Sequence, residues 1–198
     1  MCDMSKGKFF ILLVITISLC LQSCNGFAQT LKEVARKAVI QCSSLNEKLE
    51  AKEVVEMKVI KIVDGDTFDG LTKDFKQVRV RLAAFDAPEK GQPYGNNARQ
   101  KLSELLFGKE VVVVMTGKEH YSRMIAKVYT KDSVDVVAEM LKSGMGWHFK
   151  RFDNNLLYHE MEEEARNAQV GLWHQDAHTP IAPWIWRKMS KEERDKNR

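Results

Sequence analysis

Short strand-like segments separated by turns dominate the sequence between residues 54 and 129, and this pattern restricts the possible fold most. Val54–Val63 is rich in β-branched residues and runs into the turn sequence of residues 64–67. Val111–Met115 and Met124–Tyr129 are two further strand-like segments, and Gln77–Ala83 lies between them and the first. The pattern predicts a β-rich domain built from short strands.

Gln77–Ala83 alternates regularly between apolar and charged residues. Because successive side chains of a strand point to opposite faces, Val78, Val80 and Leu82 share one face, and Arg79 and Arg81 share the other. The sequence therefore predicts a strand that turns its apolar face to the core and presents arginines to solvent or to a groove.

Three helices are predicted within and after these strands. The first spans residues 97–107, the second lies around residues 136–141, and the third follows Asn154-Asn155 and ends at Gly171. The expected buried residues are Ala98, Leu102, Leu105 and Leu106; Val136, Val137, Met140 and Leu141; and Leu157, Met161, Ala165 and Ala168. Five short strands with helices inserted late predict an α+β domain, a five-stranded OB-type β-barrel decorated by three helices.

The first 28 residues have the pattern of a signal peptide. Lys6 and Lys8 precede the apolar run Phe9–Leu21, which has the length of a signal-peptide core and is short for a bilayer span. The small residues of Gly26-Phe27-Ala28 predict cleavage before Gln29. We therefore expect an exported protein, either secreted or periplasmic.

A second end for this segment is open. Leu21-Gln22-Ser23-Cys24 resembles a bacterial lipobox, which would leave a lipid-anchored protein with Cys24 at its N-terminus. An uncleaved anchor is a third alternative. Cleavage after residue 28 would leave Cys42 as the one cysteine, so the core and not an internal disulfide must hold the exported domain together.

The remaining chain divides into three parts. Residues 29–52 contain a predicted helix, opened by the capping box Thr30-Leu31-Lys32-Glu33, followed by a polar linker. Residues 53–189 hold the strands and helices described above and form the predicted main domain. Residues 190–198 are almost wholly charged and are expected to form a solvated tail.

The overall charge excludes little about function. Lys plus Arg number 31 and Asp plus Glu number 27, which gives a formal net charge of +4. A protein that binds nucleic acid by bulk electrostatics usually carries a strong basic stripe, so this excess does not indicate one. It does not exclude one either, because a local patch can lie within a modest sum.

Residues capable of chemistry concentrate in three places. Asp64-Gly65-Asp66-Thr67 places two carboxylates and a hydroxyl around a glycine turn, and His120-Tyr121-Ser122-Arg123 precedes a predicted strand. The third place is the stretch from Arg81 to Glu89, which contains Asp86 and Pro88. Each motif alone has a structural explanation: an ordinary turn, or a surface ladder of ion pairs. The order in which they occur is more informative than any one of them.

In this order, the motifs resemble those of the staphylococcal nuclease (thermonuclease) family. The resemblance runs from about Val54 to Trp173 and covers most of the main domain. Further matching features are Tyr94-Gly95 at the start of the first helix, Tyr121-Ser122-Arg123 before a strand, Asn154-Asn155 and Gly171-Leu172-Trp173. The family fold is a five-stranded OB barrel with three helices, in agreement with the strand pattern.

The resemblance implies a calcium site. Asp66 and Asp86 match the two aspartates that bind Ca²⁺ in the family, and Ala87 matches a residue that contributes its backbone carbonyl. Thr67 follows the first ligand and would support it. Ca²⁺ takes six to eight oxygen ligands, so two carboxylates, a carbonyl and waters leave room for a phosphate oxygen.

The resemblance also implies a catalytic set. Glu89 matches the glutamate proposed as the general base for the attacking water, although it could instead orient that water. Arg81 and Arg123 match two arginines that hold the phosphate, a role suited to the planar guanidinium. Tyr121 is a weaker candidate for contact near the phosphate.

Two departures from the best-known family member are visible. Only residues 90–93 separate Glu89 from Tyr94, so a mobile loop of that protein is shortened here. In residues 147–152, where that protein has tyrosines that contact the nucleotide, Trp147 or Phe152 could stack on a base. A packed strand with a solvated basic end is the alternative.

Together the residues and the resemblance predict a Ca²⁺-dependent phosphodiesterase that hydrolyses DNA and RNA with low sequence specificity. We expect it to leave 3′-phosphate ends and to act on single strands or loosened duplex, as a monomer with no obligate protein partner. The alternative is a non-catalytic OB-fold module that binds nucleic acid or protein. Retention of all five charged positions, from Asp66 to Arg123, favours the enzyme.

Overall fold

The computed structural model describes residues 53–118, 123–174 and 179–197, which belong to one compact unit, Asn46–Arg198. The predicted signal peptide and lipobox, the helix and linker of residues 29–52, and Tyr121 lie outside the described residues. Within the described part of the chain, no helix has the length and apolarity needed to cross a membrane.

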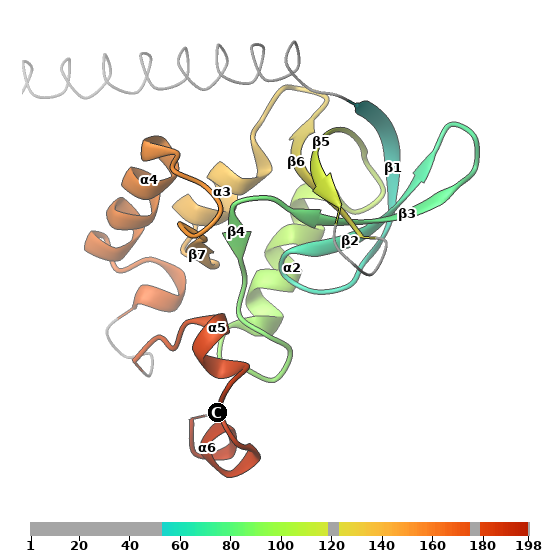
Figure 1. Ribbon diagram of the computed structural model, residues 1–198. Coiled ribbons are helices and arrows are strands. Elements are labelled where there is room, and N and C mark those ends of the chain that lie inside the picture. The colour runs from blue at the N-terminus through green and yellow to red at the C-terminus, as the bar shows by residue number, and fades with distance from the viewer. Residues whose placement is uncertain (1–52, 119–122, 175–178, 198) are drawn as a thin grey trace, which may run out of the picture. The chain divides into compact units, whose positions relative to one another are not determined.

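Five strands form a closed barrel in the order β1-β2-β3-β6-β5 (Figure 1). They are β1 (Val54–Ile62), β2 (Thr67–Thr72), β3 (Gln77–Leu82), β5 (Glu110–Lys118) and β6 (Met124–Thr130). All neighbours are antiparallel except β3 and β6, which run parallel. The barrel with its helices confirms the predicted α+β class.

The alternation of β3 has the predicted consequence. Val80 and Leu82 are fully buried in the barrel, whereas Arg79 is exposed on the opposite face. Phe68, Val113 and Val128 from the neighbouring strands are buried in the same core. Removing a side chain of this size from water contributes roughly 1.5–3 kcal/mol, so these apolar positions dominate the stability of the barrel.

β2 is the strand that the sequence pattern did not reveal. Its sequence, TFDGLT, contains an acid and a glycine, both unfavourable in strands. Asp69 is nevertheless buried because it accepts a hydrogen bond of 2.7 Å from Nε of Arg79, its cross-strand partner in β3. Pairing between strands, and not local propensity, therefore creates β2.

Helix α2 (Gly95–Leu106) packs on the barrel through Ala98, Leu102 and Leu106. Tyr94 precedes it with a φ of 65°, a left-handed conformation that turns the chain into the helix. Helix α3 (Val136–Lys142) is capped by Asp135, whose side chain accepts hydrogen bonds from the backbone N–H groups of Val137 and Ala138. The buried faces of both helices agree with the predicted ones, except that Leu105 is only half-buried.

Helix α4 (Leu156–Asn167) has a different buried face from the predicted one. Leu157 is half-buried and Ala168 is exposed at the C-cap, so their assignment to the core was wrong. The buried residues are Tyr158, Met161, Glu162 and Ala165. Tyr158 donates a hydrogen bond to Asp135 and Glu162 accepts one from Arg166, which makes burial of these two polar side chains possible.

The last elements lie outside the barrel. A two-stranded sheet joins β4 (Phe85–Asp86) to β7 (Trp147–His148), and the short 3₁₀ helix η1 (Gly171–Trp173) follows α4. Helix α5 (Pro183–Trp186) buries Trp186. The segment expected to be a charged tail contains helix α6 (Lys191–Lys196), which begins with a capping box between Ser190 and Glu193.

The turn between β1 and β2 depends on the absence of a side chain at Gly65. A Cβ atom there would lie 2.7 Å from the Cβ atoms of both Ala87 and Ala98. We expect Gly65→Ala to lower the free energy of unfolding by about 1–3 kcal/mol, because the turn must move away from α2. Chemical denaturation measures this change.

Gly117→Ala in β5 is the matched control, because a Cβ atom at Gly117 has no neighbour within 4 Å among the described residues. Equal stability of the two variants would show that the close contact at Gly65 does not constrain the turn.

Candidate active site

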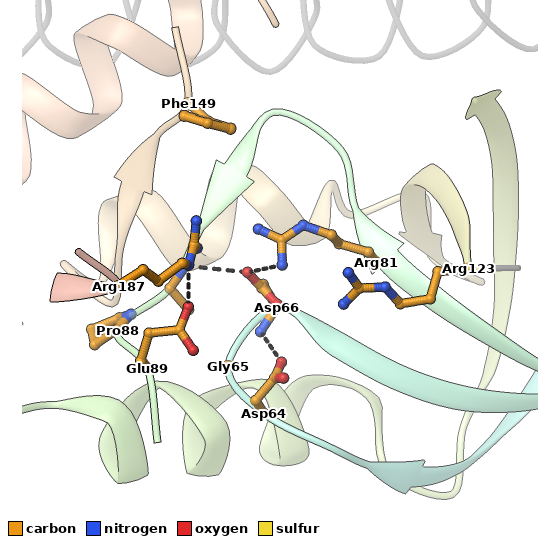
Figure 2. Close-up of a pocket in the computed structure, with 10 residues that line it drawn as sticks. Asp64, Gly65, Asp66, Arg81, Pro88, Glu89, Arg123, Phe149 and Arg187 are labelled. Atoms are coloured by element: carbon orange, nitrogen blue, oxygen red, sulfur yellow. Dashed lines mark hydrogen bonds and ion pairs between the residues drawn. The ribbon is translucent and has the colours of Figure 1, made fainter. Parts of the chain in front are cut away.

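One pocket of about 450 Å³ brings together residues from six parts of the chain (Figure 2). It is lined by Asp64, Gly65, Asp66, Arg81, Ala87, Pro88, Glu89, Arg123, Phe149 and Arg187. Five of the eight residues singled out in the sequence line it; Asp86 contacts the lining residue Arg81, and Thr67 lies directly beside Asp66. The eighth, Tyr121, lies outside the described residues.

Asp66 is held by the turn that connects β1 to β2. Its backbone N–H donates to Oδ1 of Asp64 over 3.1 Å, and its own Oδ1 accepts a hydrogen bond of 2.8 Å from the Thr67 hydroxyl. Thr67 is paired with Arg81 in the register of β2 and β3. The barrel thus places the first aspartate directly beside the strand arginine.

Arg81 bridges the two aspartates. Its Nη1 lies 2.8 Å from Oδ2 of Asp66, and its Nη2 lies 2.6 Å from Oδ1 of Asp86 in β4. Arg123 immediately precedes β6, whose first residue pairs with Val80 of β3. The parallel pairing of these strands therefore brings both predicted arginines to one pocket.

The two aspartates carry more negative charge than one arginine neutralises. Burial raises the pKa of Asp66 to about 6, although the positive charge of Arg81 opposes that rise. Burial also raises the pKa of Asp86, and the negative charge of Asp66 adds to that effect, while Arg81 and Arg187 oppose it. A cation that entered between these carboxylates would be strongly favoured.

The donors fit a hard divalent cation. Oδ2 of Asp86 is buried without a hydrogen-bond partner among the described residues, so one carboxylate oxygen is available for a ligand. Within those residues, no cluster of three or more His, Cys, Asp or Glu side chains is positioned to hold a metal. The protein would thus contribute two carboxylates, and backbone oxygens or waters would supply the rest, as Ca²⁺ and Mg²⁺ both allow.

Glu89 follows Pro88 and lies at the end of the pocket away from Arg123 (Figure 2). Its backbone N–H donates to Oε1 of Gln92 over 2.9 Å, and Oε1 of its carboxylate accepts a hydrogen bond of 2.5 Å from Nε of Arg187. Gln92 lies in the shortened loop of residues 90–93 and also donates to the backbone carbonyl of Ile181. The loop is therefore tied to the C-terminal segment.

Arg187 is the pocket residue that sequence reasoning missed. Its carboxylate partners are 98 and 101 residues away in the sequence, and its neighbours Ile185, Trp186 and Lys188 carry no motif. Only a three-dimensional contact could have identified it.

The aromatic candidates occupy different surroundings. Trp147 is 5% exposed and packs edge-on against Trp173 and Trp184, so it belongs to the core and stacking on a base was a wrong expectation for it. Phe152 is 73% exposed. Phe149, which lines the pocket, stacks on Trp184 with ring centroids 5.6 Å apart.

Comparison with known proteins gives a consistent result. Residues 79–175 match a protein family described as "Staphylococcal nuclease homologue". An "Uncharacterized endonuclease" of Haemophilus influenzae is 38% identical over 141 residues, which cover 71% of this chain and 78% of that protein. A "Micrococcal nuclease" of Shigella flexneri is 37% identical over 144 residues, which cover 68% of this chain and 81% of that protein.

The raised pKa of Asp66 makes the stability of the metal-free protein dependent on pH. In the folded state the Asp66 carboxyl keeps its proton up to about pH 6, whereas the ordinary pKa of such a carboxyl is 3.8. The folded chain therefore binds more protons between these values, and the free energy of unfolding falls as pH rises through this window. Asp66→Asn has no carboxyl to titrate at this position and therefore escapes this loss. The free energy of unfolding of the variant, minus that of the wild type, should rise by on the order of 2–3 kcal/mol from pH 4 to pH 7.

Urea denaturation in the presence of a chelator measures this difference. Asp132→Asn, at an exposed turn, is the matched control and should follow the wild-type pH profile. If the profiles of the wild type and Asp66→Asn run parallel from pH 4 to pH 7, the Asp66 carboxyl does not titrate as stated.

Proposed function

The chain belongs to the staphylococcal nuclease family and is a hydrolytic nuclease; from this premise we propose that it is a Ca²⁺-dependent phosphodiesterase that cleaves DNA and RNA with low sequence specificity. One observation carries the proposal: Asp66, Glu89, Arg81 and Arg123 line a single pocket, and Asp86 pairs with Arg81 of that pocket. The pocket combines a place for a cation, a place for a phosphate and a carboxylate able to act on water.

The metal would be held by Asp66 and Asp86, with the backbone carbonyl of Ala87 and water completing its ligands. When bound, Ca²⁺ supplies Lewis-acid polarisation of the phosphodiester and helps to orient the reacting groups. The unpartnered Oδ2 of Asp86 and the raised pKa of both aspartates support this placement.

Arg81 and Arg123 would hold the phosphate. Negative charge grows on its non-bridging oxygens as water attacks phosphorus, and a guanidinium offers several fixed donors to such oxygens. If Asp66 and Asp86 held a cation, their pull on Arg81 would weaken, and guanidinium donors that face the carboxylates would become available to the phosphate. The two arginines thus bind the group that changes charge during the reaction.

Glu89 would accept the proton from the attacking water. Its carboxylate is 39% exposed at the edge of the pocket, so water reaches it. Attack on phosphorus forms the new P–O bond and breaks the bond to the 5′-oxygen, which takes up a proton from solvent water as it leaves. The products are a 3′-phosphate end and a 5′-hydroxyl end.

The lining also supports low specificity and a preference for flexible strands. Carboxylates and guanidiniums recognise phosphate, metal and water, which carry no sequence information. The reacting groups lie inside a recess, so a phosphodiester must bend into it, which is easier in a single strand or a loosened duplex. Since one chain supplies every group named, we propose that the protein works as a monomer.

We propose that the protein is exported, with Gln29 as its first mature residue and a lipoprotein beginning at Cys24 as the alternative. Mass spectrometry of the mature protein tests this, because the two processing sites give different N-terminal masses. A full-length N-terminus in the exported fraction would contradict both.

Digestion of denatured DNA and of RNA tests the function. We expect cleavage with Ca²⁺, none with EGTA, and a loss of about 10²–10⁴-fold in rate for Glu89→Gln, which removes the proton acceptor while preserving shape. Products should resist extension by a polymerase until a 3′-phosphatase has acted on them.

Glu104→Gln on the exposed face of α2 is the matched control and should cleave like the wild type. Cleavage in EGTA, or full activity of Glu89→Gln, would contradict the mechanism. Binding of single strands without any cleavage would indicate the non-catalytic OB module instead.

A further inference from the structure

Arg187 spans the two sides of the pocket from a segment beyond the family match, which ends at residue 175. Its Nη2 lies 2.5 Å from Oδ1 of Asp86. Its Nε lies 2.5 Å from Oε1 of Glu89 (Figure 2). One planar guanidinium therefore joins an aspartate of the proposed metal site to the glutamate proposed as the proton acceptor.

The backbone that carries Arg187 is fixed to the rest of the domain. Trp186 is 3% exposed, and Ala182 packs in a cluster with Trp147 and Leu172. Arg194 from α6 donates to the backbone carbonyl of Trp186 over 3.0 Å and to that of Arg187 over 2.9 Å. The guanidinium of Arg187 therefore extends from a backbone segment that is packed against the domain, and not from a freely moving surface segment.

Glu89 needs such a partner. The backbone N–H of Glu89 is held by Gln92, but its carboxylate is 39% exposed, and Arg187 is the partner that holds one of its oxygens in the described structure. A carboxylate that takes a proton from an attacking water must be held in orientation, because small misplacements cost large factors in rate. Nε and Nη2 lie on one edge of the rigid guanidinium of Arg187 and contact two different carboxylates, so the position of Glu89 is set relative to Asp86.

We propose that Arg187 is a positioning residue for hydrolysis, and that the C-terminal segment of residues 182–194 completes the active site by holding Glu89 in orientation. This inference rests on the proposed function, in which Glu89 accepts the proton of water. Arg187 also shares Oδ1 of Asp86 with Arg81, so it competes with a cation for that oxygen. Its two contacts therefore have opposite consequences for turnover and for metal binding.

A double-mutant cycle tests the positioning role. Arg187→Gln should lower kcat about 10- to 100-fold with little change in KM, as is typical when a group that orients an active-site residue is removed. If Arg187 acts through Glu89, the same substitution should cost almost nothing further in the Glu89→Gln background. Arg187→Lys keeps the charge but not the planar fork, so most of the loss should remain.

Calcium titration by calorimetry, without nucleic acid, provides a readout independent of turnover. Arg187→Gln should bind Ca²⁺ about two- to fivefold more tightly than the wild type, the range expected when a half-exposed ion pair competing for Asp86 is lost. A general folding defect would weaken both turnover and metal binding. Arg99→Gln, exposed on α2 and outside the pocket lining, removes the same charge and should change neither quantity.

The outcomes separate this inference from the proposed function. No cleavage by the wild type with Ca²⁺ would overturn both. Wild-type cleavage that Glu89→Gln impairs but Arg187→Gln does not would overturn the role of Arg187 alone. Additive losses in the double variant, full activity of Arg187→Lys, or weaker Ca²⁺ binding by Arg187→Gln would each overturn it as well.

Discussion

The site depends on a single guanidinium that lies between two buried carboxylates. Arg81 contacts Asp66 and Asp86 at 2.8 and 2.6 Å, and without it two desolvated negative charges would face each other. Burial nevertheless raises the pKa of both aspartates, although the positive charge of Arg81 opposes that rise. Further positive charge beside these carboxylates is therefore favourable: Arg187 reaches Asp86, and a divalent cation would suit the same place.

The barrel makes this arrangement rigid. The antiparallel register of β2 and β3 sets Thr67 opposite Arg81, and the parallel pairing of β3 with β6 brings the residue before Met124 to the same side. Gly65 allows the turn that carries Asp66 to approach Ala87 and Ala98 closely. Groups that must meet at one phosphate are thus attached to strands whose relative positions are fixed by ladders of hydrogen bonds.

Sequence patterns predicted the elements whose signal is local and failed where a distant partner decides. β3 was visible because burial of Val80 and Leu82 imposes alternation, whereas β2 was missed because Asp69 depends on Arg79 across the sheet. The buried face of α4 was misassigned because Glu162 looks like a solvent-exposed residue until its ion pair with Arg166 is known. Trp147 was considered for base stacking because aromatic residues fit both a core and a binding surface.

The sequence by itself determined the class of fold and the set of candidate residues, since the strand alternation and the ordered motifs are written in local spacing. Five of the eight candidates line the pocket, Asp86 and Thr67 contact residues that line it, and Tyr121 falls outside the described residues. Only the tertiary structure decided the charge balance of the pocket and the inclusion of Arg187. Burial, which sets the pKa of Asp66, and a contact across 98 residues, which joins Arg187 to Glu89, arise only when the chain is folded.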